Sequence, residues 1–190
     1  MPSPSHQDRP RLRLEFVRPF HAQAIQKIVG HRKLAEFTRL PHPYPGDGAI
    51  TFVRESLEGR IRGHEYVFAI MEHEMLRGVC GVQDIEKTLL RGDLGYWVDP
   101  AHWGRGIATE SARAVCRFAF HTLGLTLITG SHASLNTASG RVMQKIGFRL
   151  KESKEDERLG EILCYELCAG ELVHPQEPVE MHPAAARQKL

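Results

Sequence analysis

The sequence predicts a single α+β domain in which helices flank a mixed, mostly antiparallel sheet. Segments in which apolar and polar residues alternate, as in strands, are interleaved with segments of helical period. Their order along the chain is strand, helix, helix, three strands, helix, strand, helix and two strands. With 190 residues, of which 42% are hydrophobic and 25% charged, the chain has the length and composition of one globular domain. We therefore expect about six to seven strands and about four helices.

The N-terminal half of the chain contains the first strand, two helices and a hairpin. Residues 1–10 are polar and contain prolines, so we expect a disordered leader before the domain. Residues 34–48 contain three prolines and are too irregular for one element. The remaining segments have the spacing of a strand over 12–17, a helix over 24–29, a helix over 49–59, and hairpin strands over 66–71 and 76–82.

The C-terminal half alternates strands and helices before a final hairpin. The strand over 89–98 ends at Pro100, which has no N–H for a ladder, and the helix over 104–123 ends at Gly124. The following segments indicate a buried strand over 125–129, a helix over 136–146, and strands over 148–153 and 159–168. We place the domain at residues 11–169 and expect residues 170–190, which contain three prolines, to form an extended or loose tail.

Composition excludes several classes of protein. The net charge is only +2 and Lys and Arg are scattered, so we expect no nucleic-acid partner. No stretch approaches the ~18 apolar residues of a membrane span, and residues 1–10 have no apolar core of a signal peptide. We therefore predict a cytoplasmic protein without membrane contact. The absence of Cys-x-x-Cys spacing favours buried free thiols for Cys80, Cys116, Cys164 and Cys168.

A run of acidic residues and histidine marks the tip of the first hairpin. Glu72, His73 and Glu74 lack the His-Glu-x-x-His spacing of a helical zinc site. Because a hairpin tip faces water, we expect a solvated turn there and predict no metal site.

The most informative segment joins the strand that ends near Pro100 to the following helix. Gly104 and Gly106 have no side chain to block approach, so the backbone N–H groups from Gly104 to Thr109 can converge on one anion at a helix N-terminus. The spacing matches neither a Walker loop nor the three-glycine dinucleotide fingerprint, which disfavours a P-loop ATPase, a kinase and a Rossmann dehydrogenase. The segment predicts a phosphate site made of backbone. A tight turn with close packing is the alternative.

A second segment has clear helix boundaries. Asn136 is a good N-cap, Val142 and Ile146 share one face, and Gly147 is a suitable end before Phe148 begins a new strand.

Together the two segments resemble the cofactor-binding elements of the GCN5-related N-acetyltransferases (GNAT). The first resembles the family's pyrophosphate signature, which is Gln or Arg, two residues, Gly, one residue, and Gly or Ala, with Trp103 here in the first position. The flanking Gly-Tyr-Trp and Ala-Thr-Glu look like the branch that includes the ribosomal-protein N-terminal acetyltransferases RimJ and RimL. The resemblance covers roughly residues 12–169 and implies the GNAT fold, whose sheet is splayed at its central strands.

The resemblance also implies acetyl-CoA as co-substrate and a set of residues that hold it. Asn136 would hydrogen-bond the pantetheine arm. Backbone groups left unpaired by the splay would bind pantetheine and the thioester carbonyl, and here they belong to Tyr96, Trp97 and Val98. The pyrophosphate cradle would be the backbone of Trp103, Gly104, Arg105, Gly106, Ile107, Ala108 and Thr109.

Asp93 and Ser139 are the candidate catalytic residues. Asp93 stands where RimL-like relatives commonly carry Glu, and it could take a proton from the attacking amine; a solvated Asp is the alternative. Many family members protonate the leaving thiolate with a Tyr at the position of Met143, which cannot donate a proton. Ser139, one helical turn earlier and also placed near the cofactor, is the substitute that RimL-like proteins suggest, with helix capping as the alternative.

The preferred function is acetyl transfer to the α-amino group of a protein N-terminus. A small-molecule amine acetyltransferase and a non-catalytic acyl-CoA sensor are the alternatives. The α-amino group has a pKa near 8, against about 10.4 for Lys, and so needs less help to lose its proton. Phe37 and Tyr44 lie in or near a Leu-Pro-x-Pro-Tyr segment that RimJ/RimL-like proteins share, and with Asp93 they are the expected acceptor-binding residues; a loop that only covers the core is the alternative. Monomer and homodimer both remain open.

Overall fold

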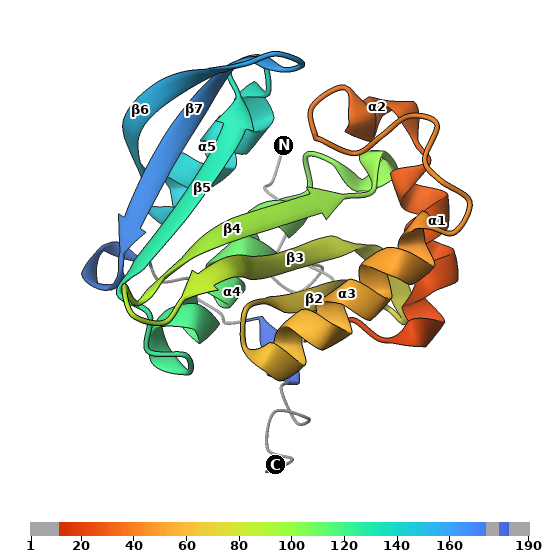
Figure 1. Ribbon diagram of the computed structural model, residues 1–190, viewed down its shortest axis with the longest axis horizontal. Helices are drawn as coiled ribbons and strands as arrows, with labels where there is room; N and C mark the ends of the chain where they lie inside the picture. The colour runs from red at the N-terminus through yellow and green to blue at the C-terminus, as the bar shows by residue number, and fades with distance from the viewer. Residues whose placement is uncertain (1–11, 174–178, 183–190) are drawn as a thin grey trace, which may run out of the picture.

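The computed structural model describes residues 12–173 and 179–182, which form one sheet with helices on both faces (Figure 1). The strands are β1 (Leu12–Phe16), β2 (Tyr66–Glu72), β3 (Met75–Glu86), β4 (Arg91–Val98), β5 (Leu127–Ala133), β6 (Arg149–Asp156), β7 (Gly160–Cys168) and β8 (Glu180–His182). The helices are α1 (Ala22–Val29), α2 (Arg32–Ala35), α3 (Gly48–Arg62), α4 (Ile107–His121) and α5 (Thr137–Ile146). The strand order is β6-β7-β5-β4-β3-β2-β1-β8, and only β4–β5 and β1–β8 are parallel pairs.

The two faces of the sheet bury two separate apolar clusters, as the alternation along β2 illustrates. Phe68 and Ile70 point toward the cluster that contains α4, whereas Val67 and Ala69 point toward the cluster that contains α1 and α3. In Figure 1, α1 and α3 lie in front of the sheet and α4 lies behind it. The predicted α+β fold with a mixed, mostly antiparallel sheet is therefore confirmed.

The sheet opens between its two central parallel strands. β4 and β5 pair only from Arg91 to Asp93 with Leu127 to Thr129. Beyond Thr129, β5 stays paired with β7 on its other side, while β4 stays paired with β3 up to Val98. The two strands diverge visibly in Figure 1, so the second half of β4 turns one backbone edge toward a gap rather than toward a ladder. The splay at the central strands is thus present.

Several element boundaries differ from the sequence prediction. Strand β5 runs from Leu127 to Ala133, later than expected, and α4 begins at Ile107 because the preceding residues form a loop with a short 3₁₀ turn over Pro100–His102. The expected loose tail contributes β8, which pairs in parallel with β1 and brings the described strands to eight. The predicted leader lies outside the described residues, as do 174–178 and 183–190 of the tail.

Burial differs from the sequence prediction at the hairpin tip and at two cysteines. Glu72, expected in a solvated tip, is 3% exposed, and only His73 and Glu74 form the turn. Arg113 is also buried, and it donates to Glu110 and to the Lys145 backbone carbonyl in α5. All four cysteines are free, but two are not buried, since Cys164 is half-buried and Cys168 exposed.

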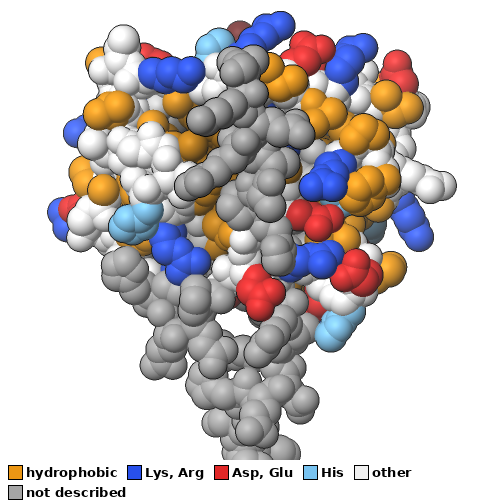
Figure 2. Space-filling model, turned by 90° about the horizontal axis from the view of Figure 1, so that it is seen from below, with side chains coloured by type: hydrophobic (Ala, Val, Ile, Leu, Met, Phe, Trp, Pro, Cys, Tyr) orange, Lys and Arg blue, Asp and Glu red, His pale blue; other side chains and the backbone are white. Residues whose placement is uncertain are grey.

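The surface carries charges of both signs. On the face seen in Figure 2, Lys and Arg side chains are intermixed with Asp and Glu. Among the described helices, none has the length and apolar character needed to cross a membrane. Within the same part of the chain, no group of three His, Cys, Asp or Glu side chains has an arrangement that could hold a metal ion.

Candidate active site

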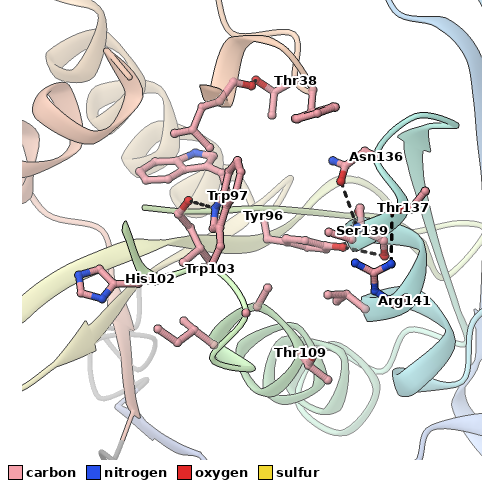
Figure 3. Close-up of a pocket in the computed structure, with 18 of the residues that line it drawn as sticks. Thr38, Tyr96, Trp97, His102, Trp103, Thr109, Asn136, Thr137, Ser139 and Arg141 are labelled. Carbon is pink, nitrogen blue, oxygen red and sulfur yellow. Dashed lines mark hydrogen bonds between the residues drawn. The ribbon is translucent and has the colours of Figure 1, made fainter. Parts of the chain in front are cut away.

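A cavity of about 410 Å³ lies at the point where β4 and β5 separate (Figure 3). Its wall comes from both faces of the sheet: α2 and the loop after it on one side, and the loop before α4 together with α5 on the other. The splay therefore makes one continuous pocket that reaches through the sheet. The predicted site residues that line it are Phe37, Tyr96, Trp97, Val98, Trp103, Gly104, Gly106, Ile107, Ala108, Thr109, Asn136 and Ser139.

The glycine loop has the geometry of a backbone anion site. Gly104 and Gly106 adopt φ of 78° and 82°, and Gly106 is the N-cap of α4. A Cβ on either glycine would meet no atom within 4 Å, so close packing does not explain them. Their positive φ favours glycine at both positions, and the absence of a side chain leaves the backbone open to a ligand. The Glu110 N–H makes the α4 bond to the Gly106 carbonyl at 3.0 Å, and amides earlier in the turn lie beyond that ladder at the pocket end.

Asn136 caps α5 and leaves its amide nitrogen for the pocket. Its side-chain oxygen accepts a hydrogen bond from the Ser139 N–H at 3.1 Å, as Figure 3 shows. Gly147 ends the helix at φ 113°. Both boundaries follow the sequence prediction, and they hold the first turn of α5 against the pocket.

The Ser139 hydroxyl forms a pair with a phenol that the sequence interpretation used only for its backbone. The Tyr96 hydroxyl lies 2.7 Å from Ser139 Oγ (Figure 3). Burial raises the pKa of Tyr96 above its usual value, more than the Ser139 hydrogen bond lowers it, so the phenol stays protonated. The sequence could have indicated that the Tyr96 side chain points this way, because the period of two places it on the same face as Leu94 and Val98, toward α4 and α5.

Met143 does not line the pocket. It is 1% exposed, and its methyl group lies against Gly130 of β5, where an added Cβ would meet it at 2.8 Å. The position that many relatives give to a tyrosine is a core position here, and Ser139 with Tyr96 is the hydroxyl pair that faces the cavity.

Asp93 lies at the fork of the splay rather than in the cavity wall. It is the last β4 residue that pairs with β5, and the Thr129 hydroxyl donates a hydrogen bond of 2.7 Å to its carboxylate. By alternation it shares a face with Trp97, which packs on the α1 and α3 side. Burial raises the pKa of Asp93, Thr129 opposes this shift, and Asp84 adds to it while Arg39 lowers it.

The expected acceptor side of the cavity corresponds to α2 and its following loop. Lys33, Leu34, Phe37 and Thr38 line it. Tyr44 does not, since its ring packs in the α1 and α3 cluster, where an added Cβ on Gly48 would lie 2.6 Å from it.

The β6–β7 turn holds this loop in place across the mouth of the splay. Arg39 pairs with Asp156 at 2.8 Å, and Arg158 donates to the carbonyls of Thr38, at short range, and Leu40, at 3.1 Å. The partners are more than a hundred residues apart in the chain, so no local sequence pattern could indicate these contacts.

Basic side chains that the sequence interpretation did not single out also line the cavity. Arg141 and Lys145 project from one face of α5, and Lys33 stands on the opposite wall. The cavity residues thus combine backbone amides, three cations, apolar walls and hydroxyl groups. This set suits a ligand with an anionic phosphate end and a long apolar arm, so the chemistry of coenzyme A fits it.

Comparison with known proteins agrees with this geometry. Residues 11–149 match the family model described as an acetyltransferase (GNAT) domain. A curated relative named as a probable N-acetyltransferase, YjcK of Bacillus subtilis, is 36% identical over 99 residues, which are 52% of this chain; the match spans only 55% of that relative.

Solved structures share the fold. RimL, described as a ribosomal L7/L12 alpha-N-protein acetyltransferase in complex with coenzyme A, superposes with a TM-score of 0.78 at 19% identity, covering 83% of this chain and 94% of RimL. Spermidine N-acetyltransferase from Vibrio cholerae, in complex with coenzyme A and spermine, gives 0.74 at 16% identity, covering 85% of this chain and 97% of the other. With the family model matching most of its length, the chain belongs to the GNAT acetyltransferases, a family that uses acetyl-CoA.

Proposed function

We propose that this protein transfers the acetyl group of acetyl-CoA to the α-amino group of a protein N-terminus. The observation that carries the proposal is the continuous cavity at the splay of the sheet, with the glycine loop and basic residues on the α4 and α5 side and residues of α2 and its following loop on the other side. A donor and an acceptor can approach each other through such a cavity from opposite faces. RimL, whose described substrate is a protein α-amino group, supports this choice.

The lining of the cavity favours this acceptor over a polyamine. Among the described residues that line it there is no Asp or Glu, whereas Lys33 stands on the acceptor side. A polycation such as spermidine would need carboxylates to offset its charge. A peptide N-terminus carries a single amine of pKa near 8, so it needs fewer acidic groups in the site to offset its charge.

Acyl transfer needs a proton acceptor and a proton donor, and Asp93 and Ser139 are the candidates for these two roles. The amine nitrogen bonds to the acyl carbon as the carbon–sulfur bond breaks, so one proton must leave the nitrogen and one must reach the sulfur. Asp93, on the acceptor face, accepts the first proton, and Ser139, on the cofactor side, donates the second and recovers it from solvent. Beyond Asp93, the edge of β4 that faces β5 pairs with no strand, and its backbone groups can orient the thioester, except the Val98 carbonyl, which accepts from the Trp103 indole. This constellation favours an enzyme over a binding-only module, and the four free cysteines support a reducing, cytoplasmic setting.

The proposal is tested by coenzyme A release with acetyl-CoA and a panel of acceptors. The panel holds peptides beginning with Ala, Ser, Met or Asp, the same peptides with a blocked N-terminus, free lysine, spermidine and an aminoglycoside. We expect turnover on one class of free N-termini and none on the blocked peptides. Turnover on spermidine or the aminoglycoside alone would overturn the choice of acceptor, and tight binding of acetyl-CoA without any turnover would favour a sensor.

Replacing the base should change the pH profile. A carboxylate accepts a proton only when ionised, so kcat/KM of the wild type should fall as the pH drops through the raised pKa of Asp93. Asp93→Asn should remove this limb. The loss should be largest, about tenfold or more, between the raised pKa of Asp93 and the amine pKa near 8, where Asp93 is ionised and the amine is mostly protonated, and smaller outside this range.

A neighbouring carboxylate provides the matched control. Asp84 raises the pKa of Asp93 and lies exposed beside it. Asp84→Asn should therefore move the acidic limb to lower pH and leave turnover above the limb unchanged. An acidic limb that persists in Asp93→Asn would remove Asp93 as the base.

A further inference from the structure

A buried carboxylate connects the β2–β3 hairpin to the glycine loop of the cofactor site. Glu72, the last residue of β2, is 3% exposed. Its two oxygens lie 2.8 Å and 3.2 Å from the guanidinium nitrogens of Arg105, which stands between the two cradle glycines. One of them also accepts from Arg77 Nε at 2.8 Å. Burial alone would raise the pKa of Glu72, but hydrogen bonds from the two arginines outweigh it and keep the carboxyl ionised.

The same arginines hold a residue of the cavity wall. His102 has one ring nitrogen 2.9 Å from Arg77 and the other 2.9 Å from Arg105. A neutral imidazole has a single lone-pair nitrogen, so it accepts from one arginine at a time while both surround it. The backbone adds one further link, because the Asp99 N–H donates to the Arg77 carbonyl at 2.7 Å. Arg77 of β3 is thus linked to the segment before α4 by its backbone at Asp99 and by its side chain at His102.

The loop depends on such contacts because it has little packing of its own. Residues 103–106 are all exposed, and the Trp103 indole N–H donates a hydrogen bond of 2.8 Å to the Val98 carbonyl. Both glycines hold positive φ in open space. An exposed loop of this kind keeps one conformation only if its side chains are bound to more rigid parts of the protein. Arg105 lies between the two glycines, and its bidentate contact with the buried Glu72 carboxylate holds this part of the loop in place.

We propose that Glu72 is a positioning residue for the cofactor cradle: through Arg105 it holds the glycine loop in the conformation that binds the phosphates of acetyl-CoA. The inference rests on the proposed use of this cradle. The proposal also identifies which basic groups remain to attract the phosphates. Glu72 offsets Arg105 and Arg77, so attraction for the phosphates comes from the loop amides and from Arg141 and Lys145 of α5. The Arg105 side chain is bound away from the cavity, although its backbone belongs to the cradle.

The test measures coenzyme A affinity by calorimetry in the absence of acceptor, together with KM values for both substrates. Glu72→Gln keeps the shape of the side chain and removes its charge, and Arg105→Gln breaks the same contact from the loop. Each should raise the Kd for coenzyme A and the KM for acetyl-CoA about tenfold, since a broken buried pair leaves its partner uncompensated. The KM for the acceptor and kcat at saturation should stay near wild type. The double variant should be no weaker than the single ones, because both remove one interaction.

Glu86→Gln is the matched control. It removes the Arg91–Glu86 pair, an exposed arginine–carboxylate contact of 2.5 Å between β3 and β4 whose residues neither line the cavity nor contact the glycine loop. We expect wild-type affinity. If Glu72→Gln fails to fold, Arg105→Gln reads the same contact from an exposed loop, where its side chain is 41% accessible.

Three results are informative. Wild-type affinity in folded Glu72→Gln and Arg105→Gln would overturn the inference. Tighter binding in Glu72→Gln would overturn it as well, because Arg105, once released, would then bind the phosphates itself. Failure of the wild type to bind coenzyme A would instead contradict the proposed function.

Discussion

Gly106→Val is expected to abolish measurable binding of coenzyme A, with affinity reduced by at least about 100-fold. The added side chain projects into the open space in front of the α4 N-terminus, where the phosphates are proposed to lie. Valine at φ 82° also strains the backbone by about 1–3 kcal/mol, which turns the loop amides away from their shared target. Calorimetric titration with coenzyme A checks the loss, and circular dichroism checks that the variant is folded.

Gly124→Val separates strain from obstruction. Gly124 has φ 72° and, like Gly106, no atom within 4 Å of an added Cβ, but it lies beyond the C-terminal end of α4, away from the cavity. Its valine variant should lose a similar amount of stability in thermal unfolding and keep wild-type affinity for coenzyme A. Unchanged affinity in Gly106→Val would rule out the backbone cradle, while equal loss in both variants would attribute the effect to unfolding.

Ser139→Ala should lower kcat by about 100-fold and leave the affinity for acetyl-CoA almost unchanged. The Ser139 N–H still reaches Asn136 in this variant, so the cap of α5 survives and only the hydroxyl is lost. Tyr96→Phe should produce a loss of the same kind. Because the phenol stays protonated, it has a hydrogen to donate to Ser139 Oγ, 2.7 Å away, and in that arrangement the serine hydrogen is free to point at the leaving sulfur. Steady-state kinetics with saturating acetyl-CoA measure both effects.

The two hydroxyl variants should be coupled. If Tyr96 acts by orienting Ser139, the double variant will be about as slow as Ser139→Ala alone. Tyr165→Phe provides the control, since Tyr165 is also a buried tyrosine near α5 but lies on β7 against His132. It should turn over at the wild-type rate. Normal kcat in Ser139→Ala would return Ser139 to a purely structural place in the first turn of α5, and additive losses would show that Tyr96 acts independently.

Local physical chemistry explains what could be predicted from the chain. Pro100 ends β4, Asn136 caps α5, and Gly147 ends it in a left-handed conformation, because each of these effects needs only a few neighbouring residues. Gly104 and Gly106 likewise stand where a loop at a helix N-terminus needs positive φ. Both motifs lie within single short segments, so the family assignment followed from them without knowledge of the fold.

Side-chain partners brought together by the tertiary structure were beyond such reasoning. Glu72 looked like part of a solvated turn until Arg105, more than thirty residues away, covered it. Asp156 and Arg158 lie between the two predicted C-terminal strands, and nothing in that segment indicates that they hold the loop after α2. Tyr44 looked like a partner of Phe37, but only Phe37 reaches the cavity.

The sequence by itself determined the order of the strands and helices apart from α2 and β8, the glycine loop before α4, the cap of α5 and hence the family, because these depend on backbone preferences and periodicity over short distances. Only the tertiary structure decided which residues face the cavity: the β4–β5 splay, the Tyr96–Ser139 pair and the burial of Glu72 all depend on contacts between segments far apart in the chain. The free energy of such contacts depends on burial and charge pairing, and neither is encoded in any one segment.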